Sequence, residues 1–226
     1  MKNYIFPVIS FETKGKTKGK FALGTGFFVT SEGHFVSAGH NFKHRDRDFF
    51  ALIDNALYEI REICHEYNEK DCQIEPTYLD LQIGKVEISK TIDFVIFGEI
   101  SDLKKGDQLL VSGFKSQELP QNELVIQSHS INISVIDIDL FYYSVLGVFK
   151  CNGVLFPRRK DPPLQHFINC ISLNNVDLQL NGLSGSPLLK DCRCYGLLIR
   201  KDSYLSSNYI LSKLKEYSII TNTENE

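Results

Sequence analysis

The stretch Gly182-Leu183-Ser184-Gly185-Ser186-Pro187 has the composition of a turn that could expose a nucleophilic serine. Gly182 and Gly185 lack a Cβ, so the backbone around Ser184 can adopt conformations that a side chain would forbid. The hydroxyl and the neighbouring N–H groups then stay uncovered, as a serine nucleophile and its oxyanion require. Glycine and serine are also common in plain turns. The nucleophile hypothesis therefore depends on a base and an acid elsewhere in the chain.

Chain order restricts the kind of triad that Ser184 could join. A serine triad needs a histidine to take the hydroxyl proton and a carboxylate to orient that histidine. The chain has six histidines, all before Ser184: His34, His40, His44, His65, His129 and His166. This excludes the α/β-hydrolase order, in which the histidine comes last, and Ser186 breaks the G-x-S-x-G pattern of that fold. No aspartate precedes His40, so the order His, Asp, Ser remains for that histidine.

His40 is the favoured base and Asp93 the favoured acid. His40 ends a short strand-like segment and follows Ala38 and Gly39, two small residues that leave its ring accessible. Asp93 stands at the start of the apolar segment 94–97, where a partly desolvated carboxylate needs a partner such as an imidazole N–H. A turn residue at the start of a strand is the plain alternative for Asp93. Its position between His40 and Ser184 favours the triad.

The remaining sequence predicts the elements that would hold these residues. Short runs rich in Val, Ile, Phe and Tyr alternate with turns about every ten residues, which is typical of β-barrels or a sandwich. We expect strands at 3–12, 21–30, 34–37, 49–60, 73–88, 92–97, 109–114, 124–136, 141–150, 166–173, 176–180, 186–190 and 194–200. The charged segment 61–71 is expected to be a surface excursion. Only the end looks helical, with Ser206 or Ser207 as the N-cap.

Composition limits the classes of protein. The 226 residues are 42% hydrophobic and 12% aromatic, which is typical of a globular chain, and the net charge of −3 gives no reason to expect nucleic acid or a membrane as partner. The short apolar run at the N-terminus predicts a strand and not a signal peptide. The six cysteines are then expected to be reduced thiols in the cytoplasm. We expect no metal site and no cofactor.

Six motifs, in chain order, resemble those of the trypsin-like (chymotrypsin-fold) serine peptidases. The closest likeness is to the bacterial branch with the glutamyl endopeptidases and the HtrA proteases, here without a PDZ domain. The motifs cover roughly residues 5–217 and are Gly24–Val29, Ser37–His40, Asp93–Ile96, Gly106-Asp107 with Val111–Phe114, Gly182–Pro187, and Cys194–Leu198.

The resemblance implies a single peptidase domain over 1–226 with an all-β fold of two six-stranded antiparallel β-barrels, at about 1–100 and 106–205, followed by a helix at about 207–218. It implies a serine endopeptidase that forms an acyl-enzyme intermediate on a protein or peptide substrate. Ser184 would be the nucleophile, His40 the base and Asp93 the residue that orients the imidazole. The backbone N–H groups of Gly182 and Ser184 would form the oxyanion hole, and Ser186 would be a weaker nucleophile candidate.

Departures from the family bear on compartment, activation and specificity. Secreted relatives carry a cysteine after the histidine, where this chain has Asn41, which favours a reducing compartment. Zymogen-type relatives carry an aspartate before the serine, where Leu183 cannot make an ion pair, so control by a partner or loop rearrangement is expected. Leu178 and Leu198 stand where charge-specific relatives carry aspartate and histidine, which predicts an uncharged P1 pocket. A shift of one residue would bring Asp177 into that pocket.

Two other functions remain open on the sequence. One is a catalytically silent module with a protease fold, in which the triad survives but the cleft is collapsed or occupied. The other is a nucleic-acid contact through the basic segments Lys14–Lys20 and Arg158–Lys160, for which a solvated loop is the plainer interpretation.

Overall fold

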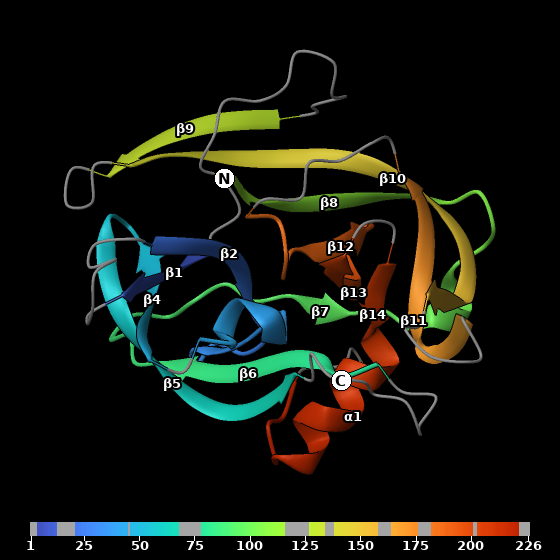
Figure 1. Ribbon diagram of the computed structural model, residues 1–226, viewed down its shortest axis with the longest axis horizontal. Helices are drawn as coiled ribbons and strands as arrows, with labels where there is room; N and C mark the ends of the chain where they lie inside the picture. The colour runs from blue at the N-terminus through green and yellow to red at the C-terminus, as the bar shows by residue number, and fades with distance from the viewer. Residues whose placement is uncertain are drawn as a thin grey trace.

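The first half of the chain forms a closed six-stranded antiparallel barrel in the computed structural model (Figure 1). The structure describes residues 4–12, 21–44, 46–67, 78–115, 127–133, 138–157, 164–175, 182–200 and 203–221. The strands are β1 (Ile5–Glu12), β2 (Phe21–Phe28), β3 (His34–Ser37), β4 (Arg47–Ile53), β5 (Ala56–Tyr67) and β6 (Asp80–Val86). They close in the order β1-β2-β3-β6-β5-β4. A 3-10 turn, η1 (Gly39–Phe42), follows β3.

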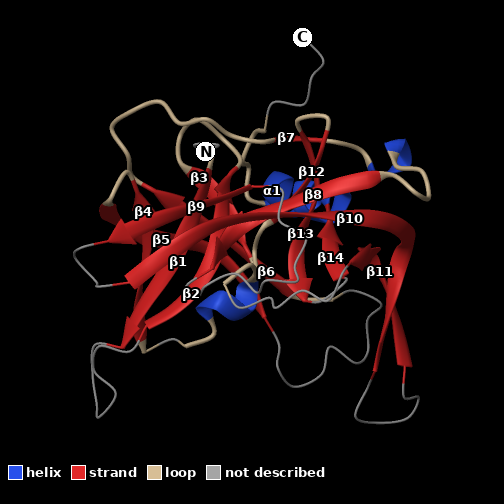
Figure 2. Ribbon diagram, turned by 90° about the horizontal axis from the view of Figure 1, so that it is seen from above, coloured by secondary structure: helices blue, strands red, loops and turns tan. Residues whose placement is uncertain are grey.

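The second half forms another six-stranded ring. Its strands are β8 (Gln108–Lys115), β10 (Ile138–Pro157), β11 (Leu164–Asn175), β12 (Pro187–Lys190), β13 (Arg193–Arg200) and β14 (Ser203–Ser206). The order β11-β14-β13-β12-β8-β10 closes because β10 also pairs with β11. Two strands lie outside the ring: β9 (Gln127–Ile133) extends the sheet from β10, and β7 (Ile96–Phe97) pairs in parallel with β13. The structure therefore has the two six-stranded antiparallel barrels that the sequence predicted, side by side in two views (Figures 1 and 2).

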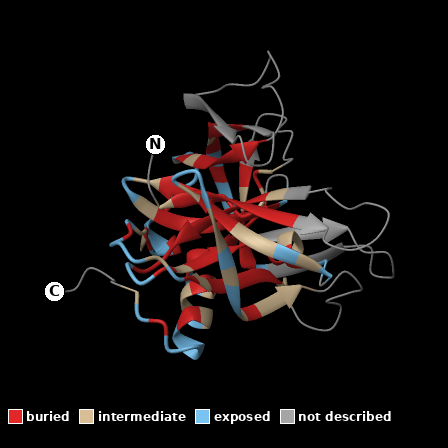
Figure 3. Ribbon diagram, turned by 90° about the vertical axis from the view of Figure 1, so that its left-hand side faces the viewer, coloured by how far each residue is buried: buried red, intermediate tan, exposed pale blue. Residues whose placement is uncertain are grey.

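Apolar side chains alternate along the strands and fill both barrels. Buried residues gather in the strands, whereas exposed ones lie mainly at turns and on the outer side of the C-terminal helix (Figure 3). One core cluster spans the two halves, since it contains Phe27 and Ile83 of the first barrel, Phe114 and Leu197 of the second, and Ile210 of the helix. The barrels are thus joined by a shared apolar interface that brings β1 and β2 next to β8.

A turn stabilised by Asp107 precedes β8, the first strand of the second barrel. Asp107 Oδ2 accepts a hydrogen bond from the Lys104 backbone N–H at 2.8 Å and one from Lys190 Nζ at 2.7 Å. Gly106 has a φ of 99°, which glycine adopts without strain. The Gly106-Asp107 motif has a structural role in this turn.

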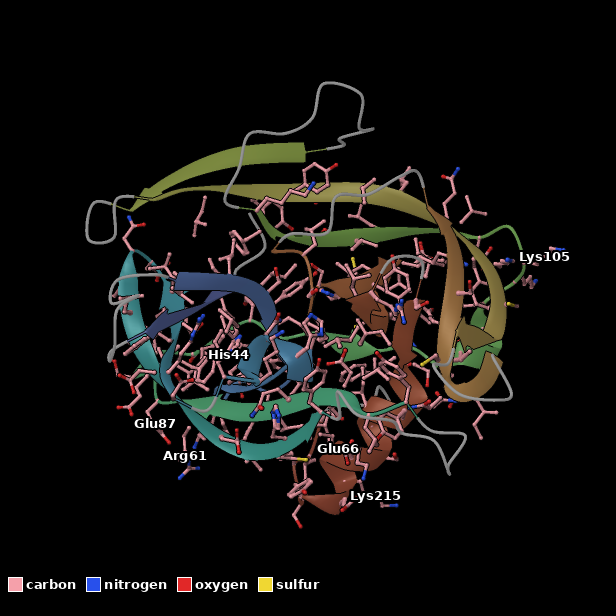
Figure 4. The ribbon with its side chains drawn as sticks, in the orientation of Figure 1. His44, Arg61, Glu66, Glu87, Lys105 and Lys215 are labelled. Atoms are coloured by element: carbon pink, nitrogen blue, oxygen red, sulfur yellow. The ribbon has the colours of Figure 1, made fainter. Side chains whose placement is uncertain are left out.

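The C-terminal helix α1 (Ser207–Glu216) joins the second barrel to the first. Ser206 is its N-cap and accepts a hydrogen bond from the Tyr209 N–H, which decides between the two predicted caps. Glu66, at the end of β5, accepts hydrogen bonds from the Tyr209 hydroxyl and from Lys213 Nζ (2.8 Å), and its place beside the helix is visible in Figure 4. Among the described residues, no helix has the length and apolar character needed to cross a membrane.

The structure differs from the sequence-based expectation at five places. The predicted strand at 49–60 is divided into β4 and β5 by a turn at Asp54-Asn55, and β14 was not predicted. Residues 61–67 belong to β5 and not to a surface excursion. The predicted strand at 73–88 is described only from residue 78, and its pairing begins at Asp80. The segment 92–97 pairs only at Ile96–Phe97, and it pairs with the second barrel, so the connection between the barrels runs from 87 to 107.

Candidate active site

His40 and Asp80 form a hydrogen-bonded pair at the barrel interface. The Asp80 carboxylate accepts the His40 backbone N–H through Oδ1 at 2.8 Å and contacts the ring Nδ1 through Oδ2 at 2.9 Å. The Asp80 side chain is only 2% exposed, whereas that of His40 is 26% exposed. A buried carboxylate that accepts both bonds fixes the ring and leaves Nε2, on the opposite edge of the imidazole, as the nitrogen that can exchange protons with a substrate.

The strand register places Asp80 beside His40. β6 runs antiparallel to β3, with Ser37 opposite Gln82 and His34 opposite Lys85. The start of β6 therefore lies at the end of β3 from which His40 follows. The Tyr67 ring lies 6.2 Å from that of His40, and Tyr67 pairs with Asp80 across β5 and β6.

The prediction that Asp93 is the acid is wrong. By Val86 the chain has reached the other end of β3, where the Val86 N–H donates to Gly33 O at 3.0 Å. Asp93 follows in the connection between the barrels, is exposed, and precedes Val95, whose N–H donates to Phe28 O near that same end. Asp93 thus lies at the wrong end of the first barrel to orient His40.

The predicted nucleophile turn has the backbone geometry that its glycines suggested. Gly182 and Gly185 both have a φ of 92°. Between them, Leu183 is fully buried in the core of the second barrel, while Ser184 is half-buried. The Ser186 N–H donates to Leu183 O at 2.9 Å, which closes the turn. The turn is therefore anchored by the apolar packing of Leu183, which stands where zymogen-type relatives have an aspartate.

Two residues of the first barrel, Thr25 and Asn41, hold this turn of the second barrel by hydrogen bonds. The Thr25 backbone N–H donates to Ser184 O at 2.9 Å, and the Thr25 hydroxyl donates to Gly182 O at 2.9 Å. The Asn41 side-chain amide, next to His40 in sequence, also donates to Ser184 O at 2.9 Å. The base and the candidate nucleophile are therefore linked through a single residue.

The other predicted site residues have different outcomes. Ser186 is fully buried and its hydroxyl has no hydrogen-bond partner among the described residues, so it is inaccessible as a nucleophile. Leu198 is fully buried in the core of the second barrel, where it has a packing role. Asp177 and Leu178 lie outside the described residues, as do both basic segments, and the uncharged P1 pocket stays a prediction. The oxyanion hole of Gly182 and Ser184 also stays a prediction, because Asn181, which precedes Gly182, is not described.

The surroundings of Asp80 contain a buried thiol and, within the described part of the chain, no metal cluster. Burial and the neighbouring Asp80 carboxylate raise the pKa of the Cys170 thiol, which keeps it protonated. No group of three or more His, Cys, Asp or Glu side chains among the described residues could hold a metal ion. The described contacts thus bring a histidine held by a buried carboxylate next to a turn that carries a half-buried serine.

Sequence reasoning missed Asp80, Thr25 and Asn41 as parts of the site. A signal for Asp80 was present, because Asp80 also precedes an alternating segment, Leu81-Gln82-Ile83-Gly84. Prediction of one strand over 73–88 placed Asp80 in its interior and hid that signal. Thr25 and Asn41 act through contacts that only the assembled barrels create.

Two solved structures are similar to this chain over nearly its whole length. The crystal structure of Deg5 superposes with a TM-score of 0.62 at 15% sequence identity, covering 97% of this chain and 90% of that one. An HtrA-type protease, AlgW, with a tripeptide superposes with a TM-score of 0.61 at 12% identity, covering 96% of this chain. This chain spans only 60% of the AlgW chain. At such identities the likeness shows the fold alone, which is the chymotrypsin-like double barrel of HtrA-type proteases.

Sequence comparisons add no family assignment. No family model matches the chain, and no curated protein matches it.

Proposed function

We propose that this protein is a serine endopeptidase whose triad is His40, Asp80 and Ser184. The observation that carries the proposal is the pair of hydrogen bonds that the Asp80 carboxylate accepts from the backbone N–H and the ring of His40. Ser184 belongs to the same site because its carbonyl oxygen is bound by the residue that follows His40. The fold shared with HtrA-type proteases supports the same reaction class.

In the acylation step, Ser184 Oγ attacks the carbonyl carbon of the scissile peptide bond while His40 Nε2 takes the hydroxyl proton. Asp80 holds the proton on Nδ1 and stabilises the imidazolium that forms. The carbonyl oxygen becomes an oxyanion, for which the Gly182 and Ser184 N–H groups are the proposed donors. His40 then protonates the amine, which leaves as the first product.

Deacylation repeats these roles with water. His40 takes a proton from the water, whose oxygen attacks the ester carbonyl of the acyl-enzyme. Collapse of the second oxyanion releases the carboxylic acid, and the proton on His40 returns to Ser184 Oγ. One peptide bond and one water are consumed, and no cofactor takes part in these steps.

The substrate in this proposal is a protein or peptide with an uncharged P1 residue. Only the sequence resemblance supports this preference, because Leu178 lies outside the described residues and Leu198 is buried in the core of the second barrel. A peptide library should show cleavage after apolar P1 residues, and cleavage mainly after Arg or Lys would reject this part of the proposal. A buried Leu183, which cannot pair with a new N-terminus, supports control by a partner or a loop rearrangement.

A fluorophosphonate probe tests the reaction directly. The wild-type protein should become covalently labelled, and Ser184→Ala should abolish the labelling, because Ser184 Oγ forms the bond to phosphorus. Ser186→Ala is the matched control and should leave Ser184 reactive, since Ser186 is buried. If the wild type is not labelled under any condition, including with candidate partners present, the protein is a silent module with a protease fold.

A further inference from the structure

Asn41 lies where two turns of the site meet. Its backbone belongs to η1 together with His40, while its side-chain Nδ2 donates to Ser184 O at 2.9 Å and to Ser37 Oγ at 3.1 Å. Both amide hydrogens are therefore used. Ser37 Oγ in turn donates to Thr25 O at 2.7 Å, which fixes its orientation. The amide is held in one rotational state, with its nitrogen toward Ser184.

The peptide unit between Ser184 and Gly185 is held by both barrels. Its carbonyl accepts the Thr25 N–H and the Asn41 amide from the first barrel, and its N–H donates to Leu198 O of the second barrel at 2.7 Å. Three hydrogen bonds from two barrels thus converge on one peptide plane. This plane sets the ψ of Ser184 and therefore the direction of its backbone.

Two glycines leave space for the junction, the set of hydrogen bonds that joins Asn41 and Thr25 to the Ser184–Gly185 peptide. A Cβ on Gly24 would lie 2.4 Å from Asn41 Nδ2, so a side chain there would displace the amide. A Cβ on Gly185 would lie 2.0 Å from Thr25 O, so the first barrel packs directly against the peptide that Asn41 binds. Such contacts are possible only where glycine allows close approach.

We propose that Asn41 is a positioning residue, which holds the turn of the base and the turn of the nucleophile in register through the carbonyl of Ser184. This inference rests on the proposed function and adds to it a residue outside the triad. Misplacement of a nucleophile by about 1 Å can cost roughly 100-fold in rate, so a hydrogen bond that fixes its backbone acts on the chemical step. Substrate affinity, which depends on the cleft, should change little.

Two substitutions of similar size separate the amide's donor role from its volume. Asn41→Leu removes the donor but strands no polar group, because Ser184 O keeps the Thr25 N–H and Ser37 Oγ keeps Thr25 O. Asn41→Asp keeps the shape but places a carboxylate oxygen against Ser184 O. Asn55→Asp, on an exposed turn between β4 and β5, is the matched control for the same chemical change.

The rate of fluorophosphonate labelling, separated into kinact and KI, gives the first test. We expect kinact to fall about tenfold in Asn41→Leu, the factor of roughly one hydrogen bond, and further in Asn41→Asp, with KI unchanged. Ile83→Val, a mild core change in the first barrel, should lower stability without lowering kinact. A wild-type kinact in Asn41→Leu, or a fall of the same size in Ile83→Val, would overturn the positioning role.

Native-state hydrogen exchange tests the junction without activity. The Thr25 and Gly185 amides should exchange faster in Asn41→Leu, whereas the Val29 amide, which donates to His34 O at the other end of β3, should be unaffected. If the wild type is not labelled but these two amides respond, the proposed function fails and the junction stands. If neither amide responds, the junction fails whatever the labelling shows.

Discussion

Replacing Asp80 by asparagine should trap His40 in the wrong tautomer. The His40 backbone N–H, 2.8 Å from Oδ1, needs an acceptor, so the asparagine oxygen will occupy that position. Its NH2 group then replaces Oδ2, which lies 2.9 Å from Nδ1. An NH2 group facing Nδ1 donates to it, and the ring proton moves to Nε2. Nε2 can then no longer accept the proton of Ser184.

The expected loss is large because the substitution acts on each proton transfer. In the chymotrypsin-like template, the corresponding change leaves the geometry intact and lowers kcat by about 10⁴. The volume and two contacts of residue 80 are preserved in Asp80→Asn. We therefore expect a similar loss of kinact with a small change in the temperature of unfolding.

Asp93→Asn is the matched control, since it removes the same charge from the alternative acid. Asp93 is exposed in the connection between the barrels, so labelling by the fluorophosphonate probe should stay within about twofold of wild type, as for most surface substitutions. Labelling rates should be compared for the wild type and both variants after circular dichroism confirms that each is folded. An equal loss in the two variants, or a loss of less than tenfold in Asp80→Asn, would refute the proposed triad.

Three further predictions concern stability and thiol chemistry. Leu183→Ala should lower the free energy of unfolding by about 2–5 kcal/mol in urea titrations, and Leu183→Asp by more, since a buried carboxylate there has no partner. The hydrogen bond to Glu66 raises the pKa of Lys213 above its ordinary value of 10.5, so this pair stabilises the fold below pH 10.5. Glu66→Gln should lower the free energy of unfolding by about 1–3 kcal/mol near pH 8. The difference in unfolding free energy between wild type and variant should shrink as the pH rises through the raised pKa of Lys213. Iodoacetamide should alkylate exposed Cys192 in the native protein but Cys194 only after unfolding, because burial raises the pKa of Cys194 to about 12; equal reactivity of the two would contradict this.

The features that sequence could predict are those that local rules determine. Alternating apolar residues indicated most strands, and Ser206 with its apolar helix face indicated α1 to within two residues. His40 and Ser184 were candidates because small neighbours stand beside each of them in the chain, and their catalytic roles stay a prediction.

The carboxylate partner of His40 was not predictable in this way, because it depends on which end of a strand lies beside His40. Asp80 and Asp93 both precede apolar segments, and only the antiparallel register of β3 and β6 separates them. Residues 61–67 were likewise mistaken for a surface excursion, because their charged side chains lie on the side of β5 that faces solvent. The backbone of β5 pairs with β6 whatever side chains that exposed side carries, so charge there does not exclude a strand.

The apolar anchor of the nucleophile turn has a consequence for how the protein responds to its surroundings. An anchor formed by an ion pair weakens with added salt and with the titration of either partner. Leu183 carries no charge, so neither variable acts on it directly. The hydrophobic effect instead loses strength on cooling. The hold that Leu183 exerts on the turn should therefore depend on temperature more than on pH or ionic strength, and it should weaken in the cold, where the hydrogen bonds to the Ser184–Gly185 peptide remain.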